Sequence, residues 1–253
     1  MAKVFDKNNI TIFHGDFLTE DLDEYTNKIN LIVTSPPYNA NKDYDIYKDN
    51  LSWDKYIEFT QKWLDKCFKL LAEDGRICIN IPITNAVDKN NKISHYSDVL
   101  QIAKSIGFKY RHTILWYKPC YHGFVWGSFM KANCPNIYTP CETILVMYKG
   151  SWYRNGGTST ITKGEFKKYF IGFWKIPGEQ RVDHPAPFPE KIPYLCIQLF
   201  SFQEDIVLDP FVGSGTTLLA AVKTKRKCIG VEISRDYINV ALERLKHIQI
   251  PIF

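Results

Sequence analysis

Two short loops of the sequence carry residue types that could bind a cofactor and position a reacting amine. The first, Thr34-Ser35-Pro36-Pro37-Tyr38, directly follows an apolar, β-branched run. Proline fixes φ and lacks an N–H, so this loop presents rigidly held carbonyl acceptors beside the Ser35 hydroxyl. Such acceptors, together with an aromatic ring, suit a planar group that carries an amine. Taken alone, the same residues could also form a proline turn whose tyrosine covers the core.

The second loop, residues 209–217 (DPFVGSGTT), lies between an apolar run and a predicted helix. Glycines allow close approach of a ligand to the backbone, and the start of a helix offers free N–H donors. Glu232 follows the next apolar run, where a carboxylate can accept hydrogen bonds from two ribose hydroxyls. Leu218 stands where a dinucleotide loop has its third glycine. The pattern therefore predicts an adenosine-containing ligand other than NAD.

Alternating strands and helices must position these loops. Apolar patterns predict strands over residues 10–16, 29–34, 76–82, 112–118, 141–149, 206–209 and 228–231. Helices are predicted over residues 53–71, with Ser52 as N-cap, over 96–106, and from 191, 216 and 235 onward. The alternation predicts an α/β fold: a Rossmann-like, mostly parallel twisted sheet with helices on both faces. Both loops then open onto one cleft, and strands from the two ends of the chain share one sheet in permuted order.

Composition limits the class of protein. The chain has 253 residues, of which 45% are hydrophobic, which excludes a disordered protein. No apolar run approaches the roughly 18–20 residues that span a membrane, and the first residues lack a secretory pattern. Seven scattered cysteines without a CxxC pair favour free thiols over disulfides or a zinc site. We therefore expect a cytoplasmic protein with no metal and no membrane partner.

A basic and aromatic segment, residues 149–181, stands out in the charge pattern. It contains seven Lys or Arg residues against two Glu, in a chain whose net charge is +5. Basic side chains can neutralise phosphates, and aromatic rings can stack on bases. A solvated basic face over a small satellite core would give the same composition. The segment favours nucleic-acid binding only in combination with the two loops.

The two loops together resemble the DNA amino-methyltransferases, which use S-adenosylmethionine to methylate exocyclic nitrogens. That family carries a (Asp/Asn/Ser)-Pro-Pro-aromatic loop, here SPPY at residues 35–38, and an FxGxG loop, here FVGSG at residues 211–215. The catalytic loop comes first, which is the order of the family's β group. HPAPFPEKIP at residues 184–193 and HGDF at residues 14–17 resemble two further cofactor-pocket motifs.

The resemblance implies roles for the matched residues. In the catalytic loop, the Ser35 hydroxyl and the Pro36 carbonyl would accept hydrogen bonds from the target amine, and Tyr38 would stack on a base flipped out of the duplex. The catalytic residues are then Ser35, Pro36, Pro37 and Tyr38. The residues implied to bind S-adenosylmethionine are Asp16, Phe17, Ala186, Pro187, Asp209, Phe211, Gly213, Ser214, Gly215, Thr216 and Glu232.

The resemblance also divides the chain and suggests partners. It implies a catalytic half over residues 1–148, a target-recognition region over 149–181 and a cofactor half over 182–253. Double-stranded DNA is the expected substrate, and a homodimer and a cognate restriction endonuclease in the same restriction-modification system are further expected partners. The residues expected to contact DNA are Arg154, Lys163, Lys167, Lys168 and Lys175.

The target base is less closely defined. In the family, Ser at the first loop position goes mostly with cytosine N4, and Asp or Asn mostly with adenine N6. We therefore expect a DNA (cytosine-N4) methyltransferase, with adenine N6 as the alternative. An RNA methyltransferase and a binding protein without activity are weaker alternatives. Carbon-5 cytosine methylation is excluded, because the Pro-Cys dipeptides precede the cofactor loop rather than follow it.

Overall fold

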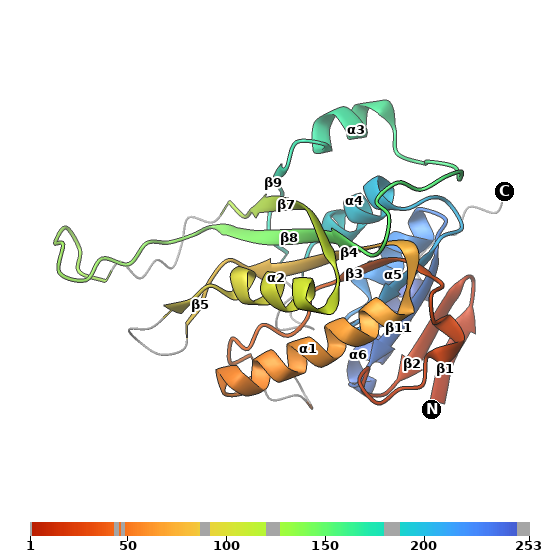
Figure 1. Cartoon of the computed structure of the whole chain (residues 1–253), viewed down its shortest axis with the longest axis horizontal. Helices are drawn as coiled ribbons and strands as arrows, with labels where there is room; N and C mark the ends of the chain where they lie inside the picture. The colour runs from red at the N-terminus through yellow and green to blue at the C-terminus, as the bar shows by residue number, and fades with distance from the viewer. Residues whose placement is uncertain are drawn as a thin grey trace.

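One nine-stranded sheet organises the molecule (Figure 1). The computed structural model describes residues 2–42, 46, 49–86, 92–119, 127–179 and 188–246. In spatial order the strands are β1 (Ala2–Lys7), β2 (Ile10–His14), β11 (Lys227–Glu232), β10 (Ile206–Asp209), β3 (Ile29–Thr34), β4 (Leu71–Pro82), β8 (Cys141–Tyr148), β7 (Lys109–Tyr117) and β9 (Phe173–Lys175). A separate two-stranded sheet pairs β5 (Asn85–Ala86) with β6 (Lys92–Ile93).

The centre of the sheet is parallel and its strand order is permuted, as predicted. β2, β11, β10, β3 and β4 are parallel neighbours, so two C-terminal strands lie between N-terminal ones. Outside this centre the sheet is mixed, because β1, β8 and β7 pair in antiparallel fashion and β9 runs parallel to β7. In the pairing of β3 with β10, Leu208 lies opposite Ile32. The loops that follow these two strands therefore leave the sheet side by side.

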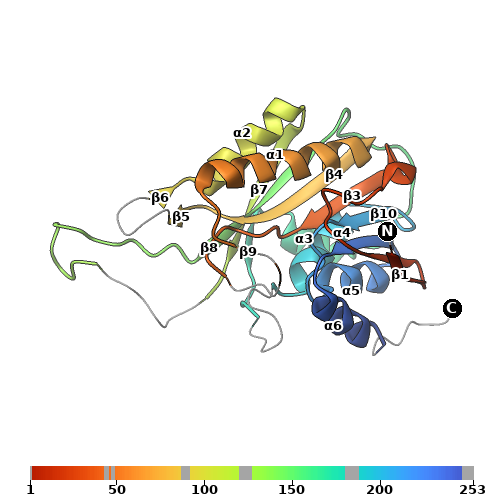
Figure 2. The same cartoon turned by 90° about the horizontal axis from the view of Figure 1, so that it is seen from below.

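Helices cover both faces of the sheet (Figure 2). On one face lie α1 (Trp53–Leu70) and α2 (His95–Ile106), and on the other lie α4 (Lys191–Phe200), α5 (Thr216–Lys223) and α6 (Arg235–Lys246). Two apolar cores result, one on each side. Burial on both faces explains why β3 is almost continuously apolar. Among the described residues, no helix combines the length and apolar character needed to cross a membrane.

Several local predictions differ from the structure. The strand predicted over residues 76–82 is longer in the structure: β4 begins at Leu71, where the backbone becomes extended, and Gly75 lies within it. At Gly75 a Cβ atom would lie 2.9 Å from the Ile29 carbonyl oxygen, so only glycine allows the neighbouring strand to approach this closely. Ser52 is the N-cap of α1, but its side chain makes no capping hydrogen bond. The edge strands β1 and β9 were not predicted.

The basic segment is joined to the main sheet. It contains α3 (Lys163–Tyr169), whose start is closed by a capping box between Thr162 and Glu165, and then β9. In β9, Trp174 lies opposite Trp116 of β7 and is 1% exposed. Residues 149–179 are therefore anchored to the edge of the sheet by a buried aromatic side chain.

Close packing between α5 and α6 depends on Gly215, which gives the first prediction. Gly215 has φ +81°, and a Cβ there would lie 2.7 Å from the Cβ of Ala241. Gly215→Ala should therefore lower the free energy of unfolding by about 2–4 kcal/mol, through backbone strain and overpacking. Urea denaturation measures this loss.

Gly156→Ala provides the matched control. Gly156 has φ +75°, but nothing lies within 4 Å of a Cβ added there. This variant has the backbone strain of a positive φ but no close contact of the new Cβ. Its free energy of unfolding should therefore fall by only about 1 kcal/mol. Equal losses in the two variants would contradict the packing role of Gly215.

Candidate active site

A single cleft lies at the carboxyl ends of the parallel strands. It holds about 1190 Å³ of space, including its open mouth. Residues from the loops after β2, β3, β10 and β11 line it together. The sequence-predicted site residues that the structure brings together here are Asp16, Phe17, Ser35, Pro36, Pro37, Tyr38, Phe211, Gly213, Ser214, Thr216 and Glu232.

A buried hydrogen bond ties the two loops together beneath the cleft. The Thr34 hydroxyl, at the end of β3, donates to Asp209 Oδ1, at the end of β10, over 2.9 Å. The same oxygen accepts the Phe211 N–H at 3.1 Å. Burial raises the pKa of Asp209 to about 6, although these hydrogen bonds favour its charged form. Asp209 therefore sets the geometry between the two loops.

Two residues of the predicted cofactor set do not line the cleft, and two more lie outside the described residues. Asp209 is 1% exposed, and neither it nor Gly215 lines the cleft. Asp209 connects strand ends, and Gly215 allows α5 to pack against α6. Their observed contacts define roles in loop geometry, and their contacts with a ligand stay predictions. Ala186 and Pro187 lie outside the described residues, so their role stays a prediction; the next residue, Phe188, does line the cleft.

Glu232 holds the glycine loop against the end of β11. Its Oε2 accepts the Gly213 N–H at 2.7 Å, and its Oε1 accepts the Ser234 N–H at 2.8 Å. The side chain is largely buried, and this burial raises its pKa. Each carboxylate oxygen has a second lone pair, so Glu232 can also accept hydrogen bonds from a ligand.

Aromatic rings form an apolar wall beside these polar groups. Phe17 meets Phe211 edge to face at 6.1 Å between ring centroids, and Phe211 meets the buried Trp63 in the same way at 5.7 Å. Asp16 precedes this wall, and its Oδ1 accepts the Leu18 N–H at 2.9 Å. The arrangement offers a flat apolar surface next to hydrogen-bonding groups, which suits a heterocyclic ring.

The SPPY loop is held by hydrogen bonds from its surroundings. The Tyr56 hydroxyl donates to the Pro37 carbonyl at 2.9 Å, and Asn85 Nδ2 donates to the Tyr38 carbonyl at 2.6 Å. Tyr56 also contacts His95 Nε2 at 2.8 Å. Burial lowers the pKa of His95 to about 4, so this imidazole is neutral near pH 7. The loop carbonyls are thus positioned before any ligand binds.

Three polar residues that the sequence did not indicate complete the site. Asn80 Nδ2, on β4, lies 2.6 Å from the Tyr38 hydroxyl oxygen and 2.7 Å from Glu142 Oε2, on β8. Lys118 forms an ion pair with the other carboxylate oxygen of Glu142. The available signal was Asn80, a polar residue in the otherwise apolar run ICINIP.

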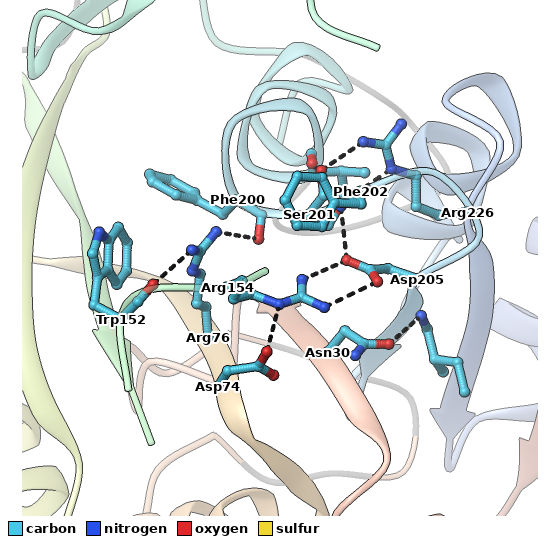
Figure 3. Close-up of polar contacts among 12 residues, drawn as sticks. Asn30, Asp74, Arg76, Trp152, Arg154, Phe200, Ser201, Phe202, Asp205 and Arg226 are labelled. Atoms are coloured by element: carbon cyan, nitrogen blue, oxygen red, sulfur yellow. Dashed lines mark hydrogen bonds and ion pairs between the residues drawn. The ribbon is translucent and has the colours of Figure 1, made fainter. Parts of the chain in front are cut away.

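Arg154 is held inside the protein by two carboxylates (Figure 3). Its guanidinium makes two hydrogen bonds to Asp205, at 2.6 and 3.1 Å, and an ion pair with Asp74 at 3.2 Å. The side chain is only 8% exposed. Arg154 therefore fixes residues 149–162 to the body of the protein, and this buried position disfavours the predicted contact with DNA, which stays a prediction. Lys163, Lys167, Lys168 and Lys175 are exposed.

The connection between β7 and β8 provides another surface beside the site. Its residues 127–140 extend away from the sheet (Figures 1 and 2). Large apolar side chains there are exposed, among them Phe129, Met130 and Ile137. The connection leaves the sheet next to Lys118 and returns next to Glu142. Glu142 accepts a hydrogen bond from the Tyr38 hydroxyl, so the base of the connection adjoins the SPPY loop.

The cysteines form no metal-binding group in the described part of the chain. Cys67, Cys78, Cys196 and Cys228 are buried free thiols, and no three His, Cys, Asp or Glu side chains of the described residues gather as metal ligands would. Cys120 and His122 lie outside the described residues.

Comparison with known proteins shows the family to which the chain belongs. A family model described as DNA methylase, covering the N6 and N4 methyltransferases, matches residues 29–243. The chain belongs to the DNA methylase family. The type II methyltransferase M.MjaVI of Methanocaldococcus jannaschii is 42% identical to this DNA methylase over 184 residues, which cover 72% of this chain and 93% of the relative.

Solved structures show the same fold. A putative DNA modification methylase of Thermus thermophilus, TTHA0409, has a TM-score of 0.76 and 29% identity, with 96% of each chain covered. The same protein has been solved in complex with S-adenosyl-L-methionine. The PvuII DNA methyltransferase, which is cytosine-N4-specific, has a TM-score of 0.74 at 23% identity, with 97% of this chain and 88% of that chain covered. The predicted class of fold is thereby confirmed.

The raised pKa of Asp209 predicts a pH dependence of stability. In the unfolded chain this carboxyl has a pKa near 3.8, against about 6 in the folded protein. The folded protein therefore keeps the carboxyl protonated up to a higher pH. Stability therefore falls as pH rises through this interval. Relative to Asp209→Asn, the wild-type free energy of unfolding should decrease by about 2–3 kcal/mol between about pH 4 and pH 7. Parallel stability curves for the two proteins would contradict this assignment.

The ion pairs of Arg154 give a second prediction for this region. Arg154→Ala leaves the Asp205 carboxylate without its guanidinium partner in a nearly buried position, so the free energy of unfolding should fall by about 3 kcal/mol. Lys168→Ala, at an exposed site on α3, should change it by less than about 0.5 kcal/mol. Thermal and urea unfolding distinguish the two variants. A small change in the free energy of unfolding for Arg154→Ala would contradict the structural role of Arg154.

Proposed function

We propose that this DNA methylase transfers a methyl group from S-adenosylmethionine to the N4 amine of cytosine in double-stranded DNA. The observation that carries the proposal is the shared cleft of the SPPY and FVGSG loops. One loop offers acceptors for an amine, and the other lies at the start of a helix beside a buried carboxylate. A base flipped out of the duplex would enter between them.

The residues of the cleft fit S-adenosylmethionine. Glu232 supplies acceptors for the ribose hydroxyls, and Asp16 with Phe17 offers a polar edge and a flat face for adenine. Phe211 and the loop after it, with Ala186 and Pro187 on the remaining wall, would hold the rest of the cofactor. The complex of the Thermus thermophilus methylase with this molecule supports the assignment. When bound, it supplies an electrophilic methyl group on a sulfonium sulfur.

The SPPY loop would then activate the amine by position. The exocyclic nitrogen of cytosine is a weak nucleophile, because its lone pair is delocalised into the ring. The Ser35 hydroxyl oxygen and the Pro36 carbonyl oxygen would each accept a hydrogen bond from this amine. These two hydrogen bonds would turn the nitrogen lone pair toward the methyl group. As the N–C bond forms, the S–C bond breaks, and the nitrogen then releases one proton to solvent. The loop is held in place beforehand, so little order must be created on binding.

Cytosine N4 is preferred over adenine N6 because of Ser35. In the DNA amino-methyltransferases that the sequence resembles, Ser at this position goes mostly with cytosine. Adenine N6 remains the alternative, since adenine presents a similar amidine edge. The PvuII enzyme shares the fold at 23% identity and carries no weight in the choice of base.

Two surfaces would meet the DNA. The basic segment has exposed lysines that can neutralise phosphates. They are Lys163, Lys167, Lys168 and Lys175. The exposed apolar side chains of the β7–β8 connection, among them Phe129 and Met130, lie on a segment whose base adjoins the SPPY loop. A division of the chain at residues 148 and 181, a homodimer, a cognate restriction endonuclease and a cytoplasmic location stay predictions.

The function is tested by incubating the protein with S-adenosylmethionine and unmethylated duplex DNA of varied sequence. The DNA is then digested, and mass spectrometry identifies the nucleosides. N4-methylcytosine is the expected product. N6-methyladenine would overturn the choice of base, and methylation of RNA alone, or of no nucleic acid, would overturn the proposed function.

Ser35→Ala gives the matching prediction for the catalytic loop. It removes the hydroxyl acceptor but leaves the cofactor wall intact, so methyl transfer should fall by at least about a hundredfold. The dissociation constant for S-adenosylmethionine should change less than about threefold, since Ser35 lies on the opposite loop. Ser105→Ala, at an exposed position on α2, is the control and should retain full activity. Equal losses of cofactor affinity and rate would mean that the SPPY loop is part of the cofactor site.

A further inference from the structure

A chain of hydrogen bonds connects Ser35 to a carboxylate at the base of the β7–β8 connection. Ser35 Oγ lies 2.7 Å from the hydroxyl oxygen of Tyr38, which in turn lies 3.2 Å from Glu142 Oε2. Glu142 is largely buried, with its side chain 14% exposed, and its second oxygen is paired with Lys118. No part of this chain beyond Ser35 and Tyr38 belongs to the SPPY motif.

The direction of each hydrogen bond follows from the chemistry of the groups. A carboxylate only accepts, and a tyrosine hydroxyl has a single hydrogen to donate. That hydrogen goes to Glu142, since otherwise the lone pairs of Tyr38 would face a negative oxygen at 3.2 Å. The Tyr38 oxygen therefore accepts from Ser35, and the Ser35 hydroxyl donates its own hydrogen along the chain.

Asn80 reinforces this direction. Its Nδ2 donates to Glu142 Oε2 and to the Tyr38 hydroxyl oxygen, at 2.7 and 2.6 Å. The carboxylate also fixes the amide orientation, because a flipped Asn80 would place its oxygen against Glu142. With one hydrogen from Asn80 and one from Ser35, the Tyr38 oxygen has both lone pairs occupied. Of Ser35, Asn80 and Glu142, only Glu142 can then accept the hydrogen of Tyr38.

We propose that Glu142 is a positioning residue that acts through Tyr38 to keep the Ser35 hydroxyl oxygen an acceptor toward the target amine. The inference rests on the proposed function. A free serine hydroxyl can turn either way, and one that donated toward the amine nitrogen would occupy the lone pair needed for attack. The carboxylate removes that freedom and makes the neutral Ser35 oxygen more electron-rich through a polarised chain. This provides a physical reason for a serine to serve where relatives of the motif carry Asp or Asn.

The test is a double-mutant cycle in single-turnover methyl transfer, at saturating S-adenosylmethionine and DNA. Glu142→Gln keeps the shape of the side chain but offers an amide that can donate toward Tyr38. Tyr38→Phe keeps the ring and removes the link. Each single variant should lower the rate by about tenfold or more, with unchanged affinity for S-adenosylmethionine as evidence of an intact fold.

The combined variant decides between positioning and structural support. If Glu142 acts through Tyr38, the double variant should be no slower than Tyr38→Phe by more than about twofold. Multiplied losses would overturn the inference, because Glu142 would then matter without Tyr38. Glu73→Gln is the matched control: Glu73 is an exposed partner of Lys149, so this variant should keep the wild-type rate.

The failure of the inference is distinct from the failure of the proposed function. A wild-type rate for Glu142→Gln, in a wild-type protein that methylates DNA, would overturn the role of Glu142 alone. A wild-type protein that methylates no DNA would overturn the proposed function, and the inference with it.

Discussion

The parallel pairing of β3 with β10 is the constraint on which the site depends. These strands come from opposite ends of the sequence, and their pairing brings residues 35–38 and 210–216 to the same edge of the sheet. The Thr34–Asp209 hydrogen bond joins the two strands where they end, and the Asp209 oxygen also holds the start of the glycine loop. Burying a carboxyl there raises its pKa to about 6, so the junction is maintained at a cost in stability near neutral pH.

The rest of the molecule supports this edge. Helices on both faces bury most of β3 and β10, which keeps their carboxyl ends in register. On one side, Glu232 at the end of β11 accepts a hydrogen bond from the Gly213 N–H, so β11 contributes to the same edge of the sheet. On the other, Asn80 and Glu142 extend it to β4 and β8, so a single line of strand ends carries the groups for the cofactor and for the amine. The antiparallel β8 matters here because it begins, rather than ends, at this edge.

The sequence predicted what local patterns encode. The apolar runs located the central strands, and the motifs located the two loops with Glu232, since each depends on residues close in sequence. Arg154 could not be interpreted this way, because its partners Asp74 and Asp205 are far away in the sequence. The hydrogen bond between Asn80 and Glu142 could not be predicted either, because 62 positions separate these residues in the sequence. β9 is too short for a periodic signal and exists because Trp174 is buried beside β7.

The most direct test of the shared cleft is a crystal structure with sinefungin, an unreactive analogue of S-adenosylmethionine that carries an amine in place of the transferable methyl group. The adenosine should lie against Phe17 and Glu232, and the amine should point toward Ser35 and the Pro36 carbonyl. That result would place donor and acceptor sites on the two loops that β3 and β10 bring together. Sinefungin bound with its amine directed away from the SPPY loop, or bound outside this cleft, would contradict the central claim.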